Sequence, residues 1–311
     1  MKKFFVKLFL VLATVVNVFG GLTVQAQEDG KLNVVITTTH LADMAQDIGG
    51  EHVNVTGLMG PGVDPHGYEP TPSDIDALNN ADLIGYNGLH LEAMFTDVFE
   101  SMEKSGANIF SLDEAITEDQ ILDYKYEGKD LEDDPHIWFD IQIWDQAAKL
   151  VADEFAALDP DNADYYQANY EDYSKRLEEL DQYVKDKVAE LPEEDRILIT
   201  AHDAFSYFGE KYDFRVEGIQ GINTQTEAGT GDISITADLV IEEEVPAVFI
   251  ESSVSDRNVQ ALIEAVEARG GSLGIGGELF SDAMGTDEEN AGNYFDCYKT
   301  NVDTIVEGLK K

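Results

Sequence analysis

One long segment without glycine or proline, residues 162–191, most constrains how this chain can fold. The segment is rich in Glu, Asp, Lys, Tyr and Leu, which predicts a single helix. At 1.5 Å per residue such a helix is about 45 Å long, enough to run along two small lobes. We therefore expect a rigid spine with a solvated, charged face instead of a flexible linker.

Short apolar runs alternate with helical patterns on both sides of this segment. The expected strands are 34–37, 53–58, 83–86 and 109–110 before it, and 197–200, 215–218, 247–251 and 272–275 after it. The expected helices include 41–48, 73–79 (entered by Pro72 and capped by Ser73), 91–104, 141–158 and 258–268. Repeated strand–helix–strand order is typical of parallel sheets.

The predicted fold class is therefore α/β, with two parallel-sheet lobes joined by one long spine helix. We expect an N-terminal α/β lobe at 27–160, the connecting helix at 161–192 and a C-terminal α/β lobe at 193–311. The most loop-like internal segment is 113–134, which is acidic and contains no histidine.

The N-terminal residues predict a secretory signal peptide at 1–26. Three lysines precede an apolar run at 8–19, and small residues follow near Ala26. A transmembrane anchor is the alternative, but this run is shorter than the roughly 20 residues that span a bilayer. Cys297 is the only cysteine, which excludes an internal disulfide, a thiolate metal site and a lipid-carrying cysteine near the cleavage point. We expect an exported protein that is soluble in a periplasm.

Acidic side chains dominate the composition, with 63 Asp and Glu against 20 Lys and Arg and a net charge of −43. A chain of this charge is a poor partner for nucleic acid, so we expect none. A heavily solvated surface suited to a saline habitat explains the charge better than metal binding does.

Four polar motifs carry the candidate chemistry. They are DPHGYEPTPSD around His66, DPHIWFD around His136, TAHDAFSYF around His202 and GGELFSDAMG around Asp282. His66, His202 and Asp282 follow expected strands, and His136 precedes the helix expected at 141–158. Ligands bind outside the carboxyl ends of parallel strands, and each lobe supplies two of the four residues. The simplest arrangement is one metal site in the cleft between the lobes.

Three imidazoles and one carboxylate form a complete ligand set for a divalent transition metal ion. A bidentate carboxylate would raise the coordination number and suit manganese better than zinc. Proline before His66 and before His136 stiffens the backbone that holds each ring. The three other histidines, His40, His52 and His90, are interpreted as a strand-end polar group, a surface residue and a helix-entry residue.

The motifs, their order and their spacing resemble the cluster A-I solute-binding proteins of manganese and zinc ABC transporters, of the TroA type. The segments that carry the resemblance are TAHDAFSYFGEKYDF, IQGINTQTEA, VFIESSVSDRNVQAL and GGELFSDAMG, and it extends over 37–306. It implies two α/β lobes on one long helix, with metal held by His66, His136, His202 and Asp282. It also implies a membrane permease as partner, and we expect the chain to act as a monomer.

The resemblance leaves Mn²⁺ and Zn²⁺ open as the ion bound, one per chain. The third ligand is histidine, where many manganese-type relatives have glutamate. Asp282 in SDAMG resembles the manganese-leaning branch, and 113–134 lacks the histidine-rich insertion of many zinc-uptake relatives. Manganese is therefore favoured over zinc, with iron behind both, although such sites hold zinc more tightly at equilibrium.

Two other classes of protein remain as alternatives. A metallohydrolase would need an open coordination position and a general base, for which Asp203 or Glu69 could be imagined. No zinc-protease motif such as HExxH occurs, and all four ligands are already committed, so we expect no enzyme. An adhesin would bind no stoichiometric metal, and no residue pattern indicates an adhesive surface.

Overall fold

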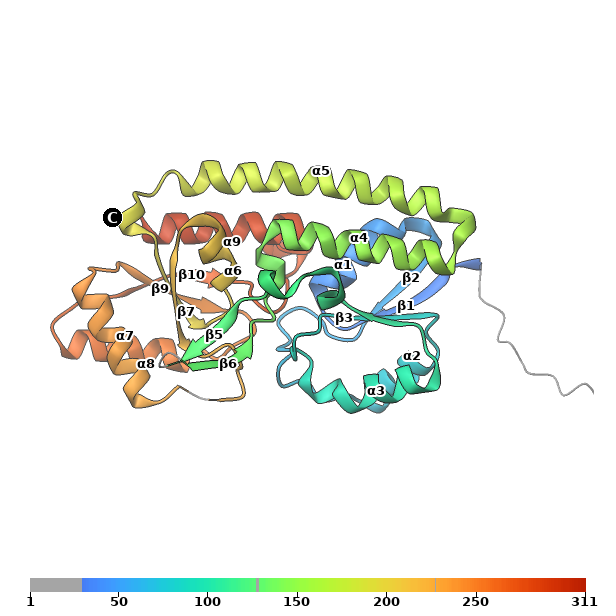
Figure 1. Cartoon of the computed structure of the whole chain (residues 1–311). Coiled ribbons are helices and arrows are strands. Elements are labelled where there is room, and N and C mark those ends of the chain that lie inside the picture. Colours follow the sequence, from blue (N-terminus) through green and yellow to red (C-terminus); the bar gives the residue numbers. More distant parts are fainter. Residues whose placement is uncertain (1–29, 127–128, 227) are drawn as a thin grey trace, which may run out of the picture.

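The structure is a computed structural model, and it describes residues 30–126, 129–226 and 228–311. The expected signal peptide lies outside the described residues. Figure 1 shows two lobes side by side beneath a long helix, with each lobe built around its own sheet. The predicted α/β class, with two parallel-sheet lobes and one long helix, is confirmed.

The N-terminal lobe contains a four-stranded parallel sheet in the order β2-β1-β3-β4. Its strands are β1 (Leu32–Ile36), β2 (Val53–Gly57), β3 (Leu83–Tyr86) and β4 (Ile109–Ser111). Successive side chains of β1 enter different clusters: Val34 and Ile36 join the large core, whereas Val35 joins the smaller one. Both faces of the sheet are therefore covered, as the near-continuous apolar strands predict.

The helices that cover these faces are α1 (Thr39–Gly49), α2 (Pro72–Asn79) and α3 (Thr96–Ser105), together with α4 (Ile141–Leu158). In Figure 1, α1 and α4 lie on the face toward the long helix, and α2 and α3 lie on the opposite face. Short 3₁₀ turns complete the lobe: η2 (Gly50–His52), η3 (Ala93–Phe95), η4 (Leu112–Ala115), η5 (Glu118–Gln120), η6 (Ile137–Phe139) and η7 (Pro160–Asn162).

The C-terminal lobe repeats the design, with a parallel sheet in the order β10-β9-β7-β8. Its strands are β7 (Ile197–His202), β8 (Arg215–Gln220), β9 (Ala247–Glu251) and β10 (Gly274–Leu279). Its helices are α6 (Ser206–Tyr212), α7 (Thr230–Glu242), α8 (Arg257–Ala268) and α9 (Tyr294–Leu309), with turns η8 (Glu193–Asp195) and η9 (Asp287–Glu289).

The long helix α5 (Ala163–Val188) spans both lobes in Figure 1, as predicted for 162–191. Its buried residues Tyr166, Tyr173, Leu180 and Val184 belong to one hydrophobic cluster, which also contains core residues of both lobes. The spine is therefore part of the core and not a tether.

Three local predictions before the long helix were wrong. Segment 113–134 is not one loop, because it contains a two-stranded antiparallel sheet of β5 (Asp123–Tyr126) and β6 (Lys129–Asp133). Helix α2 is capped by Thr71 instead of Ser73, with Pro72 as its first residue. The helix expected at 91–104 begins with the 3₁₀ turn η3, and its α-helical part starts at Thr96.

Among the described residues, no helix combines the length and the apolarity needed to cross a membrane.

Candidate metal centre

The structure brings together all four residues singled out from the sequence. His66 lies in the loop between β2 and α2, and His136 immediately precedes η6. Asp282 follows β10, and His202 is the last residue of β7. We expected β7 to end at Thr200, but it runs two residues further because His202 pairs with Gln220 of β8. All four side chains are buried, with exposed fractions of 0–3%.

Their possible ligand atoms lie within 4.8 Å of one another and could hold a metal ion. The Nε2 atoms of His136 and His202 are each 3.3 Å from an oxygen of Asp282, and Nε2 of His66 is 4.0 Å from Asp282 Oδ2. None of these nitrogens, and neither oxygen of Asp282, has a hydrogen-bond partner within the described residues. Buried polar atoms are rarely left unpaired, so five such atoms facing one point fit a divalent cation.

The two Asp-Pro-His sequences share one local structure. Asp64 Oδ1 accepts a hydrogen bond from the backbone N of His66 at 2.8 Å, and Asp134 Oδ1 accepts from that of His136 at 2.9 Å. An aspartate that binds the backbone two residues further on closes a tight turn. The prolines predicted to hold the histidines are therefore assisted by the aspartates, and the Asp repeated in both motifs is the sequence signal for this role.

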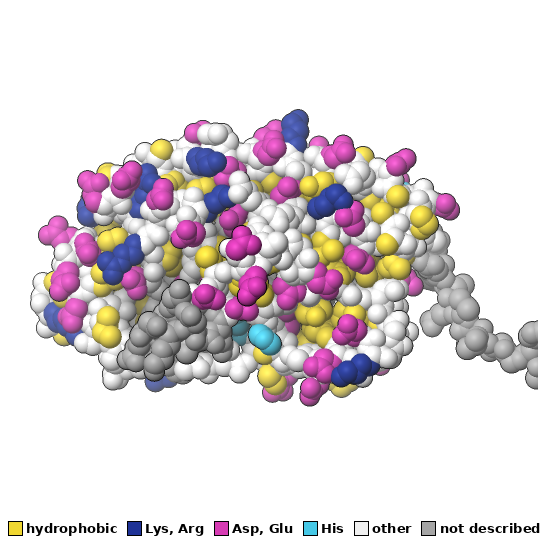
Figure 2. Space-filling model, in the orientation of Figure 1, with side chains coloured by type: hydrophobic (Ala, Val, Ile, Leu, Met, Phe, Trp, Pro, Cys, Tyr) yellow, Lys and Arg dark blue, Asp and Glu magenta, His cyan; other side chains and the backbone are white. Residues whose placement is uncertain are grey.

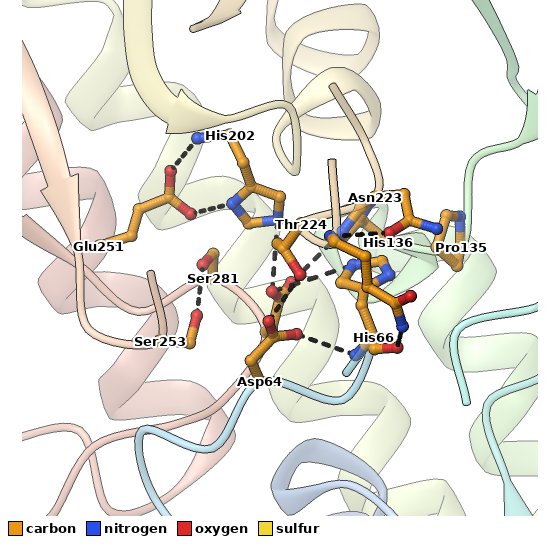
Figure 3. Close-up of polar contacts among 12 residues, drawn as sticks. Asp64, His66, Pro135, His136, His202, Asn223, Thr224, Glu251, Ser253 and Ser281 are labelled. Carbon is orange, nitrogen blue, oxygen red and sulfur yellow. Dashed lines mark hydrogen bonds and ion pairs between the residues drawn. The ribbon is translucent and has the colours of Figure 1, made fainter. Parts of the chain in front are cut away.

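Two of the histidine rings also contact a buried carboxylate through Nδ1, the ring nitrogen that does not face Asp282. Figure 3 shows one of these pairs, Glu251 beside His202. His136 Nδ1 is 2.7 Å from Asp134 Oδ1, and His202 Nδ1 is 2.5 Å from Glu251 Oε2. The other oxygen of Glu251 accepts a hydrogen bond from the backbone N of His202 at 2.8 Å. Sequence reasoning did not single out Glu251, which ends strand β9, although it lies in the segment VFIESSVSDRNVQAL that carries the resemblance.

These surroundings move the pKa values of the histidines in opposite directions. Burial lowers the pKa of His66 to about 3, because the favourable field of Asp282 does not offset desolvation. Burial also opposes the charged form of His136, but Asp134 and Asp282 raise its pKa to about 9. Burial also opposes the charged form of His202, but Asp282 and Glu251 raise its pKa well above the usual value.

Asp282 is the negative counterpart of these rings. Burial alone would raise its pKa, but His202 and His136 hold that pKa well below the usual range. The carboxylate is therefore ionised at neutral pH and offers both oxygens to a cation.

The lobes touch each other at this centre. Thr224, in the loop after β8, donates a hydrogen bond from Oγ1 to Asp64 Oδ2 at 2.5 Å, and the neighbouring Gln225 side chain donates to the backbone oxygen of His66. Trp138 Nε1 donates to the backbone oxygen of Ser281 at 3.0 Å. These contacts join the two lobes beside the ligand residues.

The three remaining histidines lie outside the group of four. His40 is buried and stacks on Trp138, with ring centroids 5.0 Å apart. His52 packs edge-on against Tyr165, and His90 is exposed.

The chain belongs to the family of periplasmic zinc-uptake complex components A (ZnuA), whose model matches residues 34–308. The resemblance to cluster A-I metal-binding solute-binding proteins is thereby confirmed. The chain is 40% identical to the manganese-binding lipoprotein MntA of Bacillus subtilis over 284 residues, 91% of each chain. It is 42% identical to the zinc-binding protein TroA of Treponema pallidum over 286 residues, 92% of this chain and 91% of TroA.

The solved structure of the periplasmic zinc-binding protein TroA from Treponema pallidum has the same fold. The two structures agree with a TM-score of 0.86 at 43% sequence identity, and the match covers 91% of this chain and 100% of TroA.

Proposed function

We propose that this chain captures one divalent transition metal ion through His66, His136, His202 and Asp282 and delivers it to the permease of an ABC transporter. The observation that carries the proposal is the convergence of four buried potential ligands, two from each lobe, whose ligand atoms lie within 4.8 Å of one another. Such a centre shields its ion from water on all sides, which suits capture better than catalysis. The ion is cargo that the permease removes.

Manganese is the proposed cargo, and zinc is the alternative. Relatives named for each metal are almost equally similar to this chain. Both oxygens of Asp282 face the centre without a hydrogen-bond partner among the described residues, which permits bidentate binding and a coordination number above four. Zinc sites in proteins are mostly four-coordinate, whereas oxygen ligands suit manganese.

Capture is proposed to take place outside the compartment in which the chain is made. The chain would be exported through its signal peptide and act as a soluble monomer, without nucleic acid. Relatives such as MntA are named lipoproteins, but here Cys297 is the only cysteine and it is buried in α9. Acidic side chains are spread over the face shown in Figure 2, which fits an exported protein in a saline medium.

Neither of the two carboxylates considered as general bases is one of the four residues of the centre. Asp203 accepts a hydrogen bond from Ser206 Oγ at 2.9 Å, and Glu69 is exposed. We therefore propose that the chain is not an enzyme.

Calorimetric titration of the metal-stripped mature protein with Mn²⁺, and separately with Zn²⁺, tests the proposal. We expect one ion per chain, with binding lost in His66→Ala and in Asp282→Ala because each removes a ligand. The exposed His90 provides a matched control, since His90→Ala should bind like the unaltered protein. Tight binding of Zn²⁺ alone would transfer the assignment to zinc, and the absence of any stoichiometric site would refute the four-residue centre.

A further inference from the structure

Glu251 is a buried carboxylate that the proposed ligand set does not use. It ends strand β9, and its side chain is fully buried against His202 at the end of the adjacent strand β7. Thr200 lies opposite Phe249 in this pair of strands, so the parallel register carries His202 and Glu251 to the same edge. In Figure 3 Glu251 lies beside the His202 ring and away from His66 and His136.

Both oxygens of Glu251 face nitrogen atoms of His202. Oε1 accepts a hydrogen bond from the backbone N at 2.8 Å, and Oε2 is 2.5 Å from ring Nδ1. The opposite ring nitrogen, Nε2, is the one directed at Asp282, at 3.3 Å. One carboxylate therefore contacts the backbone and the ring of the same residue.

We propose that Glu251 is a positioning residue that fixes the tautomer and the orientation of His202 for metal capture, an inference that rests on the proposed function. A histidine that binds metal through Nε2 carries its hydrogen on Nδ1. An ionised carboxylate only accepts hydrogen bonds, so Glu251 stabilises that tautomer and also secures the backbone N–H. The ring is then held in the orientation in which Nε2 faces the ion.

A neutral amide of the same shape cannot make both contacts. Gln at position 251 has one accepting oxygen and one donating NH₂ group. If the NH₂ group faces Nδ1, it favours the hydrogen on Nε2, and that tautomer cannot bind the metal. If it faces the backbone instead, two buried donors oppose each other, which is costly. The carboxylate is therefore required for its chemistry as well as its size.

The same arrangement recurs at the ligand supplied by the other lobe. Asp134 Oδ1 lies 2.9 Å from the backbone N of His136 and 2.7 Å from ring Nδ1. His136 Nε2, like that of His202, is directed at Asp282. Each lobe thus contributes one imidazole whose backbone and ring are held by a single buried carboxylate.

The test is titration of the full chain with Mn²⁺ and with Zn²⁺ before and after Glu251→Gln. We expect binding to weaken about 10–100-fold, the usual effect of removing a carboxylate partner of a metal-binding histidine. Glu92→Gln is the matched control, because Glu92 is equally buried and accepts hydrogen bonds from Thr37 Oγ1 at 2.6 Å and Asn87 N at 2.8 Å. Its substitution should leave affinity unchanged.

Nitrogen-15 NMR of the Zn²⁺-loaded protein distinguishes positioning from general destabilisation. In the unaltered protein the His202 ring should show Nε2 bound to metal and a strongly hydrogen-bonded Nδ1–H. In Glu251→Gln this Nδ1–H signal should weaken or shift, while the His136 ring, held by Asp134, stays unchanged. Should the variant fail to fold, Asp134→Ala makes the same test on His136, with His202 as the internal reference, because it removes the one oxygen that makes both contacts.

The outcomes separate this inference from the proposed function. Tight binding in the unaltered protein with equal affinity and an unchanged His202 ring in Glu251→Gln would overturn the role of Glu251 and leave metal capture standing. Equal losses in Glu251→Gln and Glu92→Gln would also overturn it, because the effect would then be general. Failure of the unaltered protein to bind either ion would overturn both.

Discussion

Each imidazole of the candidate centre has a different electrostatic environment, although all three face the same carboxylate. His66 is buried with a pKa lowered to about 3 by desolvation, so its ring is neutral at neutral pH. His136, beside Asp134, has a pKa raised to about 9 despite burial, and the pKa of His202 is raised well above its usual value. At neutral pH, without metal, the His136 and His202 rings therefore hold a second proton. A metal ion that binds through Nε2 would have to displace it.

This difference predicts that metal affinity rises with pH up to about 9, where the His136 ring loses its second proton. A raised pKa means that the proton is held below that pKa and lost above it, so proton competition weakens as pH increases. Each proton released changes the apparent affinity by about tenfold per pH unit. Calorimetric titrations in two buffers of different ionisation enthalpy would count the protons, and binding without proton release at pH 7 would contradict the prediction.

The sequence allowed the four candidate ligands to be predicted, because each lies in a short polar motif beside a buried strand. Glu251 could not be identified in this way. It matters only because β9 lies next to β7 in the folded sheet, and strand order is not readable from local pattern. The role of Asp134 could have been predicted, because Asp134 precedes His136 in the same Asp-Pro-His order in which Asp64 precedes His66.

At the scale of elements, the first residues of a helix decide where it starts, and helix α2, which follows the His66 loop, is an example. Thr71 caps α2 by accepting from Asp74 N at 3.3 Å, while its own backbone N donates to Asp74 Oδ2 at 2.8 Å. Proline at the first helical position then fits without cost. Ser73, predicted as the cap, lies inside the helix, because Pro72 already has the φ angle of a helix.

We expect Thr71→Ala to lower the free energy of unfolding by about 0.5–2 kcal/mol through loss of the capping contacts. Ser73→Ala is the matched control, because Ser73 is exposed and, among the described residues, its hydroxyl forms a hydrogen bond only with the Thr71 hydroxyl, at 2.8 Å. Urea unfolding curves would measure both variants. A larger loss in Ser73→Ala than in Thr71→Ala would show that the cap had been misassigned.

Most elements followed from periodicity, and the exceptions have physical reasons. Strand β10 extends to Leu279, beyond the predicted 275, although Gly276 and Gly277 normally weaken strands. Gly276 lies so close to the Phe249 ring that a Cβ there would be 2.6 Å from it, so the close packing of the neighbouring strand explains that glycine. Tertiary contact, which the sequence does not display, overrides the local preference.

At the scale of the whole molecule, the spine helix is anchored to both lobes. Arg176 Nη1 lies 2.8 Å from Asp47 Oδ2 on α1, and Tyr183 donates a hydrogen bond to Asp303 on α9 at 2.7 Å. The buried face of α5 also joins the core that extends through both lobes. Large relative motion of the lobes would have to break this packing.

We therefore predict a small closing movement when metal binds. Spin labels on cysteines introduced at the exposed Glu103 and Glu267, one in each lobe, would report the distance between the lobes with and without metal. Cys297 is buried and should not react with the label. Treating the chain without the introduced cysteines with the same label would verify this. A wide hinge rotation, seen as a large change in that distance, would contradict the prediction.

The centre draws on residues that stand far apart along the chain, with Asp282 close to its end. A chain that is still unfolded, or still crossing a membrane, has no such centre, since no two of the four residues are neighbours in sequence. Cargo can be loaded only where folding is completed. On the proposed function, a chain exported unfolded would leave its compartment of synthesis empty, and the metal it carries would reflect the supply on the far side.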